Sequence, residues 1–110
     1  MTLTIYDWLQ VQAYVVRHMI GIISSNFREV RLLFEDNMWV IYVCLESDNE
    51  EDIEEIEDMV DEVSISIEFN PELISAAANV NNESEIDIIP KEKRLKHDKE
   101  GVILFRRKET

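Results

Sequence analysis

The stretch Glu46–Glu62, ESDNEEDIEEIEDMVDE, decides the fold that we predict for this chain. Eleven of its seventeen residues are acidic and none is basic, and such a composition is typical of disordered segments, because like charges repel. Isoleucine and valine residues nevertheless recur among the acids at intervals of three and four positions, which is the spacing of one side of an α-helix. These residues are Ile53, Ile56, Val60 and Val63. We therefore predict an amphipathic helix with a strongly negative outer face.

The two ends of this helix are marked to different degrees. Ser47, with Glu50 three positions later, has the form of a capping box, which predicts the start of the helix. At the other end, residues 63–69 alternate like a strand, while Ile67 keeps the helical spacing. Length and continuity favour a helix to about Glu68, ended by the following Asn-Pro pair.

A second helix and a hairpin are predicted before the acidic stretch. Thr4, with Asp7 three residues on, can cap a helix whose apolar residues continue at helical spacing to about Ile23. Two strand-like runs follow, 27–35 and 38–45, joined by Asp36 and Asn37. Both of these residues tolerate the left-handed backbone that a two-residue hairpin turn needs.

The register of this hairpin separates two faces. One face carries an apolar patch that is predicted to belong to the core: Val30, Leu32, Phe34, Trp39, Ile41 and Val43. The other face is mixed, with Glu29, Arg31, Leu33, Met38, Val40, Tyr42 and Cys44. A partly apolar face of this kind is either covered by another part of the chain or available to a partner.

The rest of the chain completes an α+β fold. A short helical turn is expected over 73–78, a strand over 83–89, a charged connection over 91–100 and a last strand over 102–107. The resulting order is α-β-β-α-β-β, which suggests a four-stranded antiparallel sheet with two helices packed on one face. A length of 110 residues predicts a single domain over 1–110.

Composition limits the class of protein. The formal net charge of −13 argues against nucleic acid or an anionic membrane as a partner and favours a cationic protein. Cys44 is the single cysteine, so no internal disulfide can form. Together with the absence of a recognisable signal peptide, this predicts a cytoplasmic protein.

Charge is also unevenly distributed along the chain. Residues 1–90 carry a net charge of −17, whereas residues 91–110 carry +4. The basic tail can neutralise part of the acidic helix within one domain, or it can bring two molecules together head to tail. The sequence leaves both arrangements open.

Few residues suit catalysis or a cofactor. His18 and His97 lie far apart, Cys44 has no basic neighbour, and the chain has no glycine-rich phosphate loop. Trp8 and Trp39 are expected in the core. We therefore predict that the protein is not an enzyme and has no metal site or cofactor.

Three segments carry a resemblance to a known class of proteins. Residues 21–30, GIISSNFREV, end a helix; a hairpin and the acid-rich helix around 48–58 follow; and residues 102–109, VILFRRKE, close the chain. This arrangement resembles small bacterial immunity proteins of toxin–immunity loci, and it is most similar to those of contact-dependent growth inhibition systems. Such proteins bind a co-encoded toxin domain and block it. The segment 70–82 departs from the pattern as an insert.

The resemblance implies that the partner is a toxin domain, expected to be a basic nuclease and first of all a ribonuclease. We expect a 1:1 complex in which this acidic protein covers the active-site cleft. Charges would steer association, while buried apolar groups would supply most of the binding energy. Tyr42, Leu33, Val40 and Met59 are the candidate anchors. The predicted partner-binding residues are Tyr42, Glu46, Asp48, Glu50, Glu51, Glu54, Glu55, Asp58, Asp61 and Glu62.

Two other functions fit the same features. Secretion chaperones are also small acidic α/β proteins, and they bind an extended segment of an effector. A DNA mimic would use the acids in place of phosphates to occupy a DNA-binding protein.

Overall fold

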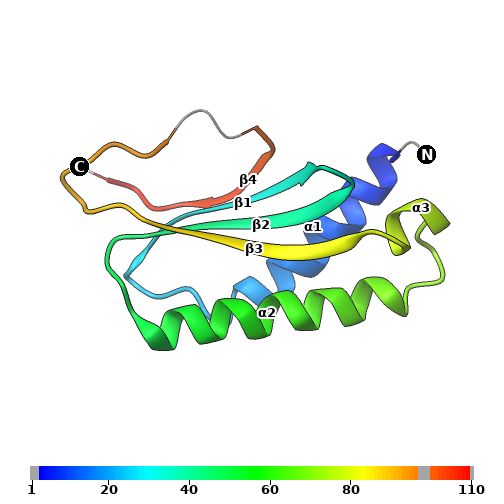
Figure 1. Cartoon of the computed structure of the whole chain (residues 1–110), viewed down its shortest axis with the longest axis horizontal. Coiled ribbons are helices and arrows are strands. Elements are labelled where there is room, and N and C mark those ends of the chain that lie inside the picture. The colour runs from blue at the N-terminus through cyan, green and yellow to red at the C-terminus, as the bar shows by residue number, and fades with distance from the viewer. Residues whose placement is uncertain (1–2, 97–99, 110) are drawn as a thin grey trace.

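A computed structural model of the chain describes residues 3–96 and 100–109 and shows one four-stranded sheet with helices beside it (Figure 1). The elements are α1 (Ile5–Met19), β1 (Phe27–Glu35), β2 (Met38–Leu45), α2 (Glu50–Glu68), α3 (Ser75–Ala78), β3 (Asn81–Ile88) and β4 (Val102–Arg106). The α+β class is confirmed. The predicted order α-β-β-α-β-β omitted α3, but the short helical turn expected over 73–78 is present there between α2 and β3.

The first helix begins as predicted and ends earlier. Thr4 Oγ1 accepts a hydrogen bond from the backbone of Asp7, and the Asp7 carboxylate accepts one from the backbone of Thr4, so the capping box is present. The helix ends at Met19 rather than near Ile23. Ile20 caps the helix and Gly21 comes next, and glycine is unfavourable in helices. The turn beyond the helix places Ile23 at the edge of the core.

The hairpin has the predicted turn and register. Asp36 and Asn37 both have positive φ, 52° and 58°, as a two-residue turn between twisted strands requires. Val30 pairs with Val43, and Phe34 pairs with Trp39. The turn residues therefore fix which side chains enter the core.

The sheet is mixed, and the prediction of an antiparallel sheet was wrong. Its strand order is β3-β2-β1-β4, with β1 antiparallel to both β2 and β4, but β3 parallel to β2. The reason is the position of α2 between these two strands. A helix that crosses from the end of β2 back to its beginning lets the next strand run in the same direction.

The main core lies between the sheet and its two long helices. In Figure 1, α1 and α2 lie on the same side of the sheet. Val11 and Val15 of α1 and Ile56 and Val63 of α2 pack with the predicted apolar face of the hairpin. Trp39 is buried at the centre, with its ring centroid 5.0 Å from that of Trp8.

The other face of the sheet is covered by the chain itself. Ile89 and Leu95, from the connection after β3, pack on the outer-face residues Leu33, Val40, Tyr42 and Cys44. The mixed face predicted from the hairpin is thus a second, smaller core. It is not an open surface.

Arg28 holds this covering segment in place. Its side chain is 2% exposed and donates from Nη1 to the carbonyl oxygens of Ile89, Pro90 and Lys93, at 3.1, 3.1 and 3.0 Å. Its Nε and Nη2 donate to the two carboxylate oxygens of Glu109, both at 2.7 Å. These bonds hold the pKa of Glu109 down at about 2. One arginine therefore links β1, the covering segment and the C-terminal region.

The basic residues after position 90 pair mainly along the sheet. Arg106 contacts the buried Glu29, Lys96 contacts Asp87 at 3.2 Å, and Arg107 contacts Glu46 at 2.8 Å. Glu46 is the first residue of the acidic stretch and precedes α2, so the basic tail neutralises the beginning of that stretch. Where the structure is described, no tail residue pairs with a carboxylate of α2 itself.

Candidate functional site: the acidic outer face of α2

The start of α2 is held by two asparagines. Asn49, and not the predicted Ser47, is the N-cap, because its Oδ1 accepts a hydrogen bond from the backbone of Asp52 at 3.0 Å. The side chain of Asn26 joins the Asp52 carboxylate and the backbone of Ser47, at 3.0 and 2.8 Å. Ser47 is therefore engaged in anchoring the loop, which leaves the cap to Asn49.

The other end of α2 is fixed against α1. Asn70 donates a hydrogen bond to the Tyr14 hydroxyl. About two turns earlier, His18 Nδ1 lies 3.0 Å from the Glu62 carboxylate. The helix continues to Glu68, so the helical interpretation of residues 64–69 is correct.

An outer ridge runs along the exposed side of α2. Its members follow one another at intervals of three or four residues, so they form one row on the helix surface. The ridge consists of Glu51, Glu54, Asp58, Asp61, Ile65 and Phe69. Its first four members are acidic and its last two are apolar. All six are exposed, while Ile56, Val60 and Val63 point into the core.

Most predicted acidic residues lie on or beside this ridge. Asp48, Glu50 and Glu62 are exposed, whereas Glu46 and Glu55 are half-buried. Within the described ranges, Glu62 is the one carboxylate of α2 that lies within ion-pair distance of a basic side chain, that of His18. The four ridge carboxylates therefore lie in water, where a cationic partner can approach them.

The predicted apolar anchors lie elsewhere. Tyr42 is 1% exposed, and its hydroxyl donates to Asp87 at 2.9 Å; burial above all raises its pKa. Leu33 and Val40 lie beneath the covering segment, and Met59 is in the main core. None of these four side chains is accessible to a partner in this fold. The sequence reasoning missed Ile65 and Phe69, which are exposed on the ridge.

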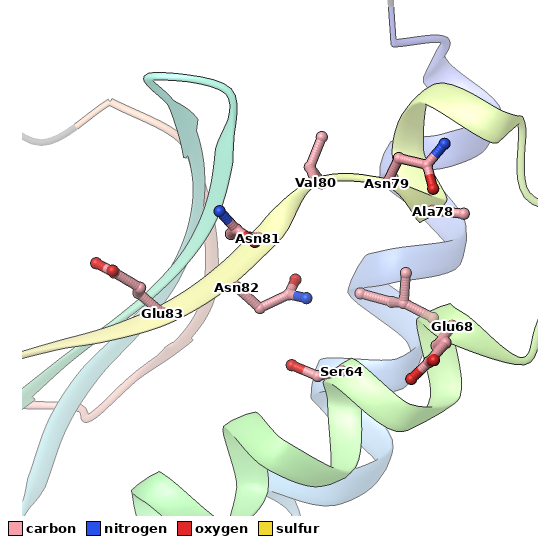
Figure 2. A pocket seen from close by; sticks show the side chains of 9 residues that line it. Ser64, Glu68, Ala78, Asn79, Val80, Asn81, Asn82 and Glu83 are labelled. Carbon is pink, nitrogen blue, oxygen red and sulfur yellow. The ribbon is translucent and has the colours of Figure 1, made fainter.

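A groove of about 580 Å³ separates the end of α2 from the edge strand β3 (Figure 2). Figure 2 shows the Asn82 side chain pointing from β3 toward α2. Glu68 and Glu83 belong to the lining, which contains no lysine or arginine, and Figure 2 shows the Glu83 carboxylate directed away from α2. Farther along α2, Glu57 and Asp61 line a second hollow against β3. The side of α2 that faces β3 is therefore also negative.

This region has no arrangement typical of an enzyme. The Ser64 hydroxyl in the groove donates to the backbone oxygen of Val60 at 2.9 Å, a common use of serine inside helices. Cys44 is buried away from the groove, and burial raises the pKa of its thiol. His97 lies outside the described residues. Across residues 3–96 and 100–109, no cluster of His, Cys, Asp and Glu could hold a metal ion.

The helices add one further observation. Over the described part of the chain, none is both long and apolar enough to cross a membrane. In α2, for example, each of the first three turns contains acidic residues.

Comparison with known proteins identifies the family. A comparison with curated protein sequences finds no match. A family model described as MafI2 immunity protein matches residues 8–109, which is nearly the whole chain. The matched range includes α2 and its ridge, the covering segment and Arg28. The chain therefore belongs to the MafI2 immunity protein family.

Proposed function

We propose that this protein docks the outer ridge of α2 onto a basic toxin domain and inhibits it. Membership of an immunity family implies that the chain binds a cognate toxin. The observation that carries the docking site is the row of four exposed carboxylates, which have no ion-pair partner among the described residues. Such a row attracts a surface of opposite charge and raises the rate of encounter.

The proposed toxin is a nuclease, and a ribonuclease is the first candidate. A nuclease cleft is basic because it must hold phosphate groups, so an acidic ridge can occupy the same cleft. In the proposed 1:1 complex, formed in the cytoplasm, the ridge covers the active site. The immunity protein then needs no chemistry of its own.

The first experiment tests binding and protection. The product of the neighbouring reading frame is co-expressed with this protein, and the complex is isolated and its mass measured. We expect a 1:1 complex and the survival of cells that express both proteins. A homodimer that holds an unfolded effector segment would instead show a secretion chaperone. Binding to many unrelated DNA-binding proteins would show a DNA mimic.

The second experiment tests the docking site. Replacing Glu51, Glu54 and Asp58 by lysine should slow association by about tenfold or more at low salt, because it reverses the steering field. The matched control replaces three exposed acids outside α2 by lysine, at Glu35, Glu92 and Glu100. Both triple variants change the net charge equally. If both slow association to the same extent, net charge and not the ridge governs binding, and the proposed docking site is wrong.

A further inference from the structure

We infer that Ile65 and Phe69, at the end of the outer ridge, are the apolar anchors that keep the toxin bound. This inference rests on the proposed docking of α2 and adds the part of the interface that limits dissociation. It assigns to the toxin an apolar pocket beside its basic surface. The acids and the anchors thus have separate kinetic roles on one helix.

The exposure of these two side chains is the first argument. Phe69 is 76% exposed and Ile65 is 56% exposed, although Ile65 lies in a helix with a well-packed inner side and Phe69 is the C-cap of that helix. Single exposed apolar residues are ordinary on protein surfaces. These two are unusual because they are adjacent, and because they continue the row of carboxylates at the same helical spacing.

Their position next to the acids determines what can cover them. A second copy docked through the same ridge would bring two rows of carboxylates together, and a formal net charge of −13 on each molecule opposes the approach of any second copy. A basic partner meets the acids favourably and can bury the apolar end in the same step. Charge complementarity therefore selects the cationic toxin as the occupant.

The energetics of interfaces require such anchors. Exposed ion pairs contribute little each, because water screens them and side-chain freedom is lost. A few residues that fill well-packed, desolvated pockets, aromatic side chains prominent among them, carry most of the binding energy of an interface. With Tyr42 and Met59 inside the protein, Phe69 is the most exposed aromatic residue among the described large hydrophobic residues.

Hydrogen bonds at the end of α2 fix the backbone of the two anchor residues. The backbone N–H of Phe69 donates to the carbonyl oxygen of Ile65 at 3.1 Å, so both residues share the last turn of α2. Asn70, the next residue, is tied to Tyr14 of α1. Little backbone conformational freedom is therefore lost on binding, which favours a long-lived complex.

Other exposed apolar residues supply matched controls. Ile5 and Ile20 are 79% and 71% exposed on α1. Helical geometry places them on a different side of α1 from Tyr14 and His18, which contact the α2 region. No exposed carboxylate lies within α1, since Asp7 is buried.

The test measures the association and dissociation rate constants of this protein with the toxin domain encoded by the neighbouring reading frame. Phe69→Ala should raise the dissociation rate constant about 30-fold, and Ile65→Ala about fivefold, with association changed less than about threefold. Ile5→Ala and Ile20→Ala should change neither constant more than about twofold. Circular dichroism and thermal melting verify that each variant is folded, which the exposure of these side chains favours.

Each contrary result has a distinct meaning. If Phe69→Ala leaves dissociation unchanged while the ridge lysines slow association, the anchors are elsewhere and only this inference fails. If the ridge lysine variant slows association no more than its control variant does, the proposed docking site is wrong and this inference fails with it. If the free protein is a dimer that Phe69→Ala dissociates, the apolar end is a self-association contact and the inference is overturned.

Discussion

On the outer face of the sheet, the charged residues Arg28 and Glu29 are almost fully buried, and each has a charged partner. In contrast, the four carboxylates of the α2 ridge lie in water and have no ion-pair partner where the structure is described. A buried charge must be paired, because an unpaired one is costly in a medium of low polarity. A row of exposed like charges costs only modest repulsion. The two regions therefore use charge differently: the sheet face uses it to hold the fold, and the ridge keeps it available for a partner.

Removing Arg28 should have the largest effect on stability. Arg28→Ala leaves the Glu109 carboxylate and three backbone oxygens without their donor, so we expect the free energy of unfolding to fall by about 3–5 kcal/mol. Urea denaturation measures this loss. The control is Arg94→Ala, because Arg94 is exposed, and it should change stability by less than about 0.5 kcal/mol. Equal losses of stability in the two variants would show that the Arg28 hydrogen bonds do not hold the covering segment on the sheet.

Neutralising Glu109 should have a smaller effect that depends on pH. Because its pKa is lowered to about 2 in the fold, the ionised form stabilises the protein above the unfolded-state value of about 4.5. This contribution is lost as the pH falls from about 4.5 to about 2. Glu109→Gln should therefore lower the melting temperature at pH 7, and the difference from wild type should shrink as the pH falls through that window. A difference independent of pH would show that the carboxylate charge is not involved.

Neutralising ridge residues should have the smallest effect, and of opposite sign. Glu54 and Asp58 lie four residues apart on the same row, so their repulsion destabilises the helix. Glu54→Gln combined with Asp58→Asn should raise the free energy of unfolding by about 0.2–0.5 kcal/mol at low salt. The gain should vanish at high salt, where repulsion is screened. A loss of stability would reveal that these carboxylates hold partners within the fold, and the contrast with the sheet face would disappear.

The sequence predicts local structure better than strand direction. Asp36 and Asn37 specify the hairpin turn, and the apolar stripe of α2 specifies its buried side. The alternation of strand β3 indicates which residues face the core, but it carries no information on whether β3 runs parallel or antiparallel to β2. The 19-residue helix between the two strands is the signal that favours the parallel arrangement.

The candidate site shows a similar division. The exposure of Glu51, Glu54 and Asp58 follows from their phase relative to the buried stripe. The burial of Tyr42 does not follow from alternation, since alternation says which face a residue occupies and not what covers that face. Among the described residues of its cover, two are apolar and buried, Ile89 and Leu95, and they lie within a charged segment. The helix predicted to about Glu68 already aligns Ile65, and Phe69 after it, with the acids, but the anchors that we predict from the sequence come from the hairpin face and from Met59.

The crossover geometry of α2 has a consequence for the partner. The helix is held at Asn49 and at Asn70, so the ridge residues have defined positions along its axis. Each residue advances about 1.5 Å along that axis. Glu51 and Phe69 are then separated by about 27 Å along the axis, and Asp58 and Phe69 by about 16 Å. In the complex that we propose, the toxin presents its cationic groups and its apolar pocket at these intervals. Length as well as charge would then select the partner, and an inserted or deleted residue within α2 would put the two halves of the ridge out of register.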